Sequence, residues 1–268
     1  MSSHIFERIK MSSSRIAKAG LSVAFALGIA LVGSGAAVAA PQHTNNDGGV
    51  STASQPSHES HAGNGTSTNW SGEVFTNANF SSVTSSWTVP TLNCPSSGFQ
   101  SSYFWVGLGG WNGNRSLEQL GTAQWCDNGD PHYGLFAEFW SSPPIAGDGG
   151  EYPGYPVAAG DTVTATVTKL SNGKYRIYET SSQGWTYSKD GNAPGTDPGN
   201  LTAEVIAEAP GDAGTPLANF GNSGFSNISY NADQNANAAL YDIKYNGVKK
   251  DSTSYDGSDG LQVNWLHS

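Results

Sequence analysis

The sequence predicts an all-β protein, folded as a two-sheet antiparallel β-sandwich. From Asn69 onward, short segments rich in Val, Thr, Trp, Tyr and Phe alternate with clusters of Gly, Pro, Asn and Ser. No stretch of ten or more residues there has the apolar spacing of a helix. The 268 residues, 37% of them hydrophobic, can bury one sizeable core. A sandwich of about 200 residues is a size that such folds reach as one domain.

Residues 1–39 are expected to be a secretory signal peptide. Lys and Arg residues precede the apolar run Leu21–Val32, and small residues follow it up to Ala39. The run is too short to span a bilayer, which argues against the alternative of an uncleaved membrane anchor. We therefore expect a secreted, extracellular protein that is cleaved after Ala39 and has no membrane partner after cleavage.

Residues 40–68 contain almost no large apolar side chains and are expected to be a flexible linker or a short pro-segment. The sandwich domain is expected to cover residues 69–268. Residues 1–39 hold four of the 12 Lys and Arg and one of the 22 Asp and Glu, which leaves a formal charge of −13 on the rest. This charge argues against nucleic acid or an anionic membrane as a partner, and it suits acidic surroundings.

The alternation of apolar and polar residues predicts individual strands. Asp161–Thr168 reads DTVTATVT, with Val163, Ala165 and Val167 on one face and threonines on the other, as a half-buried antiparallel strand requires. The same texture predicts further strands at 81–90, 101–109, 132–140, 173–181, 201–209, 239–247 and 261–265.

The stretch Asn200–Pro210, NLTAEVIAEAP, places two glutamates among small and apolar residues. Ala and Glu favour helix, but the β texture on both sides favours a strand. A strand would direct Glu204 and Glu208 to one face, roughly 13 Å apart at about 3.3 Å per residue. This separation is too large for the paired acids of a glycosidase.

Cys94 and Cys126 are the only two cysteines. A disulfide is the default for an exported pair, and a catalytic thiol near His132 is the alternative. Other hydrolytic sites have no signature: the sequence lacks Gly-x-Ser-x-Gly, His-Glu-x-x-His, Asp-Thr-Gly and Asp-Ser-Gly. We therefore expect no metal and no cofactor. Glu138, Glu204 and Glu208 remain as carboxylates in apolar settings.

A series of motifs resembles the glutamic peptidases (eqolisins, peptidase family G1), in the form of a bacterial-type secreted member. In order, the motifs are Asn69–Gly72, Trp87–Pro90, Trp105–Gly107, Leu117–Gly121, Phe136–Trp140 and Ala203–Glu208. The resemblance covers about Asn69 to Pro210, with a weaker tail to Ser268. It implies a concanavalin A- or lectin-like jelly roll that acts as an acid endopeptidase. Gln119 and Glu204 match the family's catalytic pair.

The chemistry of this pair is consistent with peptide hydrolysis. The amide of Gln119 does not titrate, so it could donate a hydrogen bond to an oxyanion at any pH. Glu204 could activate a water held between the two side chains and then return a proton to the departing amine. Trp105, Phe136 and Glu138 are candidate substrate-binding residues, although large aromatic side chains also belong in cores.

The sequence departs from the family pattern at two places. Leu108–Trp111 lacks the acidic residue of the better-known fungal members, and Phe136 replaces a tryptophan. Two alternatives therefore stay open: a carbohydrate-binding sandwich, or a glycoside hydrolase that uses Glu138 and Glu204. As partners we expect protein or peptide substrates, and we expect the enzyme to be a monomer.

Overall fold

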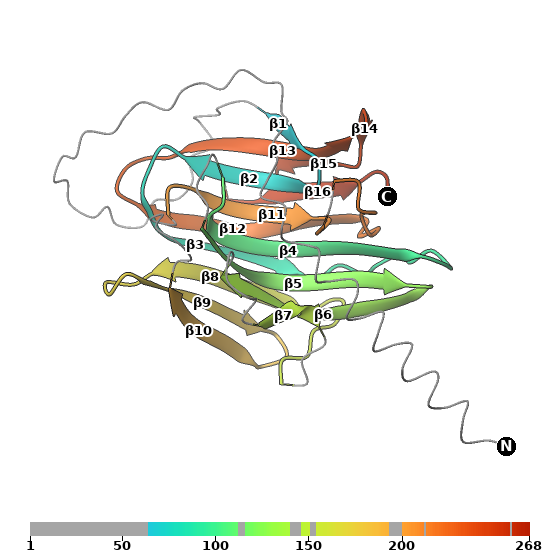
Figure 1. The fold of residues 1–268 in the computed structure, drawn as a ribbon, viewed down its shortest axis with the longest axis horizontal. Coiled ribbons are helices and arrows are strands. Elements are labelled where there is room, and N and C mark those ends of the chain that lie inside the picture. The colour runs from blue at the N-terminus through green and yellow to red at the C-terminus, as the bar shows by residue number, and fades with distance from the viewer. Residues whose placement is uncertain are drawn as a thin grey trace.

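Sixteen strands in two sheets form the molecule, and no helix occurs among the residues described (Figure 1). The structure is a computed structural model that describes residues 64–111, 116–139, 146–150, 154–192, 200–211, 213–257 and 259–268. The all-β sandwich predicted from the sequence is confirmed. In these ranges no helix is long and apolar enough to cross a membrane.

The larger sheet carries the candidate site and has nine strands, antiparallel except where β1 meets β13. Its spatial order is β1 (Gly65–Ser67), β13 (Asn237–Tyr245), β2 (Trp70–Thr76), β11 (Ala203–Glu208), β4 (Phe99–Gly109), β5 (Leu117–Asp127), β6 (Asp130–Phe139) and β7 (Ala146–Gly150), with β14 (Val248–Lys249) also paired to β13.

The smaller sheet has seven antiparallel strands and covers one face of the larger one. Its order is β10 (Thr186–Asn192), β9 (Lys174–Ser181), β8 (Thr162–Lys169), β3 (Phe80–Thr88), β12 (Asn222–Ala232), β16 (Leu261–Trp265) and β15 (Asp251–Tyr255).

Strand β8 shows how the sequence pattern produces the sandwich. Val163, Ala165 and Val167 are fully buried between the sheets, as their alternation predicts. On the opposite face, Thr164 and Thr166 hydrogen-bond to hydroxyls of β3 at 2.8 and 2.9 Å. Such cross-strand hydroxyl pairs are a regular source of stability in antiparallel sheets.

The core between the sheets contains large aromatic and aliphatic side chains from both layers. Trp87, Phe75, Phe80, Phe104 and Phe139 are among the largest of these buried side chains. The Trp87 indole N–H donates to the Thr122 hydroxyl at 3.0 Å, which joins β3 to β5 across the core. A buried indole N–H thus has its partner, as a well-packed core requires.

The first strand precedes the expected start of the domain. Strand β1 begins at Gly65, and its three residues pair in parallel with β13, so ordered backbone is present before Asn69. The expected signal peptide, 1–39, lies outside the described residues, and so does the expected linker up to residue 63.

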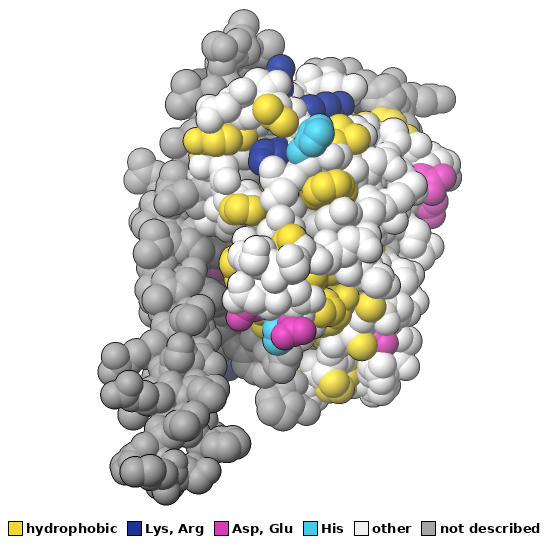
Figure 2. All heavy atoms as spheres, turned by 90° about the vertical axis from the view of Figure 1, so that its right-hand side faces the viewer, with side chains coloured by type: hydrophobic (Ala, Val, Ile, Leu, Met, Phe, Trp, Pro, Cys, Tyr) yellow, Lys and Arg dark blue, Asp and Glu magenta, His cyan; other side chains and the backbone are white. Residues whose placement is uncertain are grey.

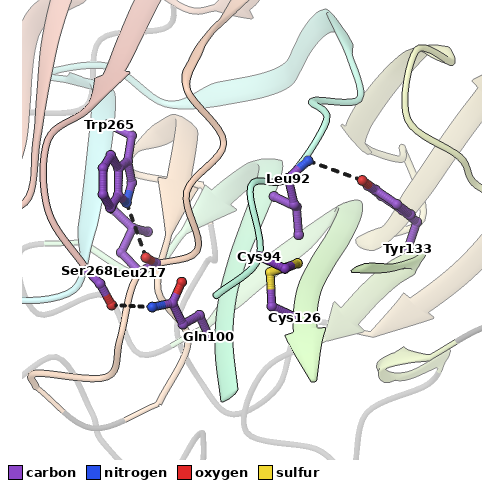
Figure 3. The surroundings of a disulfide bond; sticks show 8 residues. All are labelled: Leu92, Cys94, Gln100, Cys126, Tyr133, Leu217, Trp265 and Ser268. Atoms are coloured by element: carbon purple, nitrogen blue, oxygen red, sulfur yellow. Dashed lines mark hydrogen bonds between the residues drawn. A yellow bond between two sulfur atoms is a disulfide. The ribbon is translucent and has the colours of Figure 1, made fainter. Parts of the chain in front are cut away.

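The disulfide predicted between Cys94 and Cys126 is present, with 5.4 Å between the Cα atoms (Figure 3). It ties the segment that follows β3 to the end of β5. Nearby, the Leu92 N–H donates to the Tyr133 hydroxyl at 3.2 Å and anchors the same segment to β6. With both sulfurs bonded, the alternative of a catalytic thiol is wrong.

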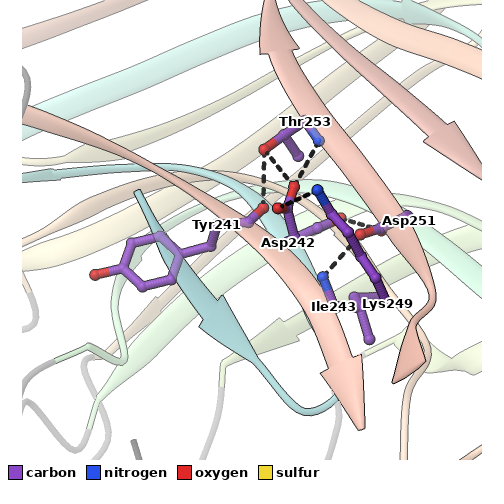
Figure 4. A network of polar contacts seen from close by, with 7 residues as sticks. Tyr241, Asp242, Ile243, Lys249, Asp251 and Thr253 are labelled. Carbon is purple, nitrogen blue, oxygen red and sulfur yellow. Dashed lines mark hydrogen bonds and ion pairs between the residues drawn. The ribbon is translucent and has the colours of Figure 1, made fainter. Parts of the chain in front are cut away.

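Polar contacts join the two sheets at the edge formed by β13 and β15 (Figure 4). The Asp251 carboxylate accepts a bond from the Ile243 N–H at 2.7 Å, and Asp242 accepts one from the Thr253 N–H at 2.7 Å. Lys249 forms an ion pair with Asp242 at 2.7 Å. These contacts hold an edge strand of one sheet against the other.

The surface carries scattered apolar side chains. Figure 2 shows one side of the molecule, where hydrophobic side chains lie mostly singly among polar ones. The large exposed hydrophobic residues in the described ranges are Phe99, Tyr178, Leu201, Val248 and Leu266. Scattered exposure of this kind is normal for a protein surface.

Candidate active site

The outer face of the nine-stranded sheet, which points away from the smaller sheet, holds a second apolar cluster. The cluster draws on strands β2, β4, β5, β6 and β11 of this one sheet, and its members are Trp70, Val74, Tyr103, Trp105, Leu117, Ala123, Phe136 and Ile206. Because side chains alternate along a strand, this set fixes which residues share the outer face. Gln119, Glu204 and Glu138 have the matching parity and lie on it.

These residues stand in one row across four adjacent strands. Glu204 of β11 pairs with Gly107 of β4, Gly107 pairs with Gln119 of β5, and Gln119 pairs with Glu138 of β6. We call these four residues the active-site row. Two strand spacings, about 10 Å at about 4.8 Å each, separate the backbones of Glu204 and Gln119. The glycine between them has no side chain to separate them.

The Gln119 side chain is fully buried and oriented by its neighbour. Its Nε2 donates to Oε2 of Glu138 at 2.9 Å. Since a carboxylate only accepts, this bond directs the NH₂ group of Gln119 toward Glu138 and leaves Oε1 on the other side. That Oε1 is buried and has no hydrogen-bond partner among the described residues.

Glu204 is buried to 4% exposure on β11, the strand predicted from the sequence. Neither carboxyl oxygen makes a hydrogen bond within ordinary distance and angle limits to a described residue. Burial raises the pKa of Glu204 well above its usual range, and the negative charge of Glu118 adds to this effect. The Thr202 hydroxyl lowers the pKa in part, without meeting those hydrogen-bond limits.

Glu208 lies on the same face but has fixed partners. It accepts hydrogen bonds from the Trp105 indole N–H at 2.9 Å and from the Asn69 amide at 3.1 Å. Burial raises the pKa of Glu208 to about 7, although the Trp105 hydrogen bond lowers it. Its carboxyl group thus anchors Trp105 rather than facing an open position.

The three candidate substrate-binding residues are all buried on the outer face: Trp105 at 5%, Phe136 at 1% and Glu138 at 2% exposure. Trp105 lies two residues before Gly107 on β4, and its indole N–H donates to Glu208. The Phe136 ring packs on Tyr103 with 5.0 Å between centroids. Glu138 contacts Gln119 directly, so its position ties it to the candidate catalytic amide.

Two features of this face were missed from the sequence. Gly107 occupies the centre of the active-site row, which only the strand pairing reveals. Trp111, just after β4, packs its ring on Trp70 at 5.3 Å and on Tyr241 at 5.2 Å. It stands in the segment where the acidic residue of the fungal family members is absent. Trp70 belongs to the motif Asn69–Gly72, but its contact with Tyr241 joins residues that are far apart in the sequence, so no short motif could predict it.

No group of three His, Cys, Asp or Glu side chains in the described ranges is arranged to hold a metal ion. The candidate site is therefore built from an amide, carboxyl groups and apolar side chains. Such a set can position a water molecule, exchange protons and stabilise a developing oxyanion.

Comparison with known proteins identifies a peptidase family. Residues 68–265 match the model of the Peptidase A4 family. Aspergillopepsin-2 of Aspergillus niger is 27% identical over 229 residues, which are 75% of this chain and 78% of that protein. Scytalido-glutamic peptidase, solved with a transition state analog inhibitor, superposes with a TM-score of 0.60 at 20% identity, over 74% of this chain and 98% of that one.

A second solved structure is SCP-B, a member of the eqolisin family, in complex with the tripeptide Ala-Ile-His. It gives a TM-score of 0.57 at 20% identity, again over 74% of this chain and 98% of the other. These structures confirm the β-sandwich, and the family match extends across nearly all of the strands. The protein thus belongs to the Peptidase A4 family, the glutamic peptidases that its motifs resemble, and it is an enzyme of the peptidase class.

Proposed function

We propose that this enzyme is a secreted endopeptidase that hydrolyses proteins in acid, with Gln119 and Glu204 as its catalytic residues. One observation carries the assignment of the pair. The buried side chains of Gln119 and Glu204 lie on one sheet face, on the two strands that flank Gly107, and each has at least one acceptor oxygen without a partner among the described residues. Unsatisfied buried acceptors are costly unless a ligand or water completes them.

A water molecule fits this requirement. It has two O–H donors, which can serve Oε1 of Gln119 and the carboxylate of Glu204 at the same time. The water is then held with its lone pairs free to attack the carbonyl carbon of a peptide bond. Glu204 accepts a proton from the water as the C–O bond forms, and the peptide carbonyl becomes an oxyanion.

Gln119 also supplies the donor for that oxyanion. One hydrogen of its NH₂ group is held by Glu138, and the second remains for the substrate oxygen. Glu138 thus acts as a positioning residue for Gln119. Because an amide does not titrate, this donor is present at any pH, which suits an enzyme that works in acid.

Glu204 completes the cycle by returning its proton to the amine nitrogen. The C–N bond then breaks, and the products are a carboxylic acid and an amine. The raised pKa of Glu204 favours the second half in acid, because it keeps a proton available for the leaving group, whereas only the ionised fraction of Glu204, which is a stronger base for the same reason, can carry out the first half.

The glycosidase alternative fits the geometry poorly. Glu138 and Glu204 stand three strand spacings apart, about 14 Å between backbones at about 4.8 Å each, whereas paired glycosidase acids are about 5–9.5 Å apart. In addition, Gln119 lies between them and is bonded to one of them. A purely carbohydrate-binding role would require neither Gln119 nor Glu204.

The decisive experiment is Glu204→Gln, assayed on a denatured protein and on a quenched peptide across acidic pH. The amide has the same shape but cannot carry a proton, so hydrolysis should be abolished at every pH while the circular-dichroism spectrum is unchanged. Gln119→Ala should lower turnover by about 10²–10³-fold, as the loss of an oxyanion donor does. Hydrolysis by a folded Glu204→Gln enzyme would refute the assignment.

A further inference from the structure

Gly107 lies at the centre of the active-site row, between Glu204 on β11 and Gln119 on β5. It has the same parity as Trp105, so a side chain at this position would project from the outer face, on the strand between those that carry Gln119 and Glu204. Glycine weakens a strand interior, so its presence at this position calls for a reason.

Backbone geometry supplies no such reason. Gly107 is not among the glycines with positive φ. An added Cβ would meet backbone only at 3.3 Å, from the carbonyl of Glu118. At Gly72 and Gly121, by contrast, a Cβ would lie 2.1 and 2.0 Å from a carbonyl oxygen of the neighbouring strand. Those two glycines are required by the packing of the chain.

The atoms that a Cβ at Gly107 would meet belong to two side chains that border the row. It would lie 2.9 Å from Cδ1 of Leu117 and 2.9 Å from Cζ3 of Trp105. Trp105 is held in place because its indole N–H donates to Glu208 at 2.9 Å. On the outer face, Gly107 therefore presents only backbone, and the side chains of Leu117 and Trp105 lie next to it.

We propose that Gly107 is a site-forming residue of the peptidase reaction, because its missing side chain leaves room for the attacking water and the scissile carbonyl between Gln119 and Glu204. This inference rests on the proposed function of that pair. A methyl group on Gly107 would lie 2.9 Å from both Leu117 and Trp105 and would narrow the room that these side chains leave for the water and the reacting carbonyl. A misplacement of about 1 Å can cost about 10²-fold in rate.

The test compares Gly107→Ala with the double variant Gly107→Ala/Leu117→Ala, with Leu117→Ala alone as the reference for the double variant. In the double variant one of the two side chains that the new methyl would press against, the flexible Leu117, is truncated, whereas the contact with the anchored Trp105 indole remains. Gly154→Ala is a matched control, since a Cβ there meets nothing within 4 Å. The measurements are the thermal midpoint, kcat and KM for a quenched peptide at about pH 4.

For Gly107→Ala we expect a fall in kcat of about 10²-fold or more with KM changed less than about threefold. The double variant should have a thermal midpoint near that of Leu117→Ala, yet it should not regain turnover. Gly154→Ala should behave as the wild type. If the double variant recovers the activity of Leu117→Ala, or if it does not fold, Gly107 serves packing alone and the proposal is wrong.

Turnover of Gly107→Ala within about threefold of wild type would also overturn the proposal. The dyad is tested separately by Glu204→Gln. An active Glu204→Gln enzyme would refute the proposed function whatever Gly107→Ala does. An inactive Glu204→Gln enzyme together with an active Gly107→Ala enzyme would refute only the role of Gly107.

Discussion

Replacing Glu118 with Gln should make the fold much less sensitive to rising pH. Glu118 alternates with Gln119 on β5 and is fully buried on the face that contacts the smaller sheet. Burial raises the pKa of this carboxyl from 4.5 to about 8, although a hydrogen bond from Ser116 and the charge of Lys169 both lower it. The folded state therefore binds this proton more tightly than the unfolded chain does.

The sign and size of the effect follow from this difference. A carboxyl with a raised folded pKa contributes stability that is complete below its unfolded pKa and is lost as pH rises through the folded value. A rise from 4.5 to about 8 corresponds to about 5 kcal/mol, at about 1.4 kcal/mol for each pH unit. Because whole domains are stable by only about 5–15 kcal/mol, the loss of this contribution should weaken the fold strongly at alkaline pH, together with that of other buried carboxyls of raised pKa such as Glu73, Glu179 and Glu208.

Urea unfolding followed by tryptophan fluorescence, at about pH 4, 6 and 8, measures the effect. Wild type should lose about 4 kcal/mol more than Glu118→Gln over this range, because the folded carboxyl is still half protonated at about pH 8, while the two should be similarly stable at the acidic end. Glutamine keeps an oxygen that can accept the Ser116 hydroxyl at 3.2 Å. Asp256→Asn, at an exposed carboxyl, is the control and should follow wild type. Parallel curves for wild type and Glu118→Gln would refute the reasoning.

Four further outcomes are expected. Gln119→Glu should move residual activity toward lower pH, because a carboxyl 2.9 Å from Glu138 donates a hydrogen bond only when protonated; an unchanged pH profile would contradict this. Glu208→Gln should cost far less turnover than Glu204→Gln, since its carboxyl anchors Trp105; equal losses in kcat would show that Glu208 takes part in the chemistry. Cys94→Ser with Cys126→Ser should lower the free energy of unfolding by about 4 kcal/mol, from a sequence separation of 32, in urea titrations. Chelators and serine- or thiol-directed reagents should leave peptide hydrolysis intact, and loss of activity in chelator with recovery in zinc would reveal a metal site.

The sequence predicted those features of the fold that depend on local alternation. Val163, Ala165 and Val167 face the core because a period of two leaves them no other place in a strand. Strand β11 was predicted against the helix propensity of Ala and Glu, and its paired ladders with β2 and β4 explain why context prevailed.

The arrangement of the candidate site could not be predicted from short sequence motifs. The sequence named Gln119, Glu138 and Glu204 as candidates, but the bond between Gln119 and Glu138 depends on which residues of β5 and β6 stand opposite each other. Likewise, the role of Gly107 appears only when β4 is placed between β5 and β11. Register of this kind is fixed by long-range packing, which no short motif encodes.

Because strand pairing alone assembles the active-site row, its function is sensitive to a kind of mutation that the surface loops tolerate. Inserting one residue inside β4 or β5 would turn every later side chain of that strand to the other face. An insertion between Leu117 and Glu118 of β5, for example, would turn Gln119 into the core and Glu118 to the outer face. The enzyme is thus expected to accept length changes between its strands while excluding single-residue insertions within β4, β5 and β11. In this molecule, we expect sheet register itself to decide whether the proposed catalytic pair is assembled.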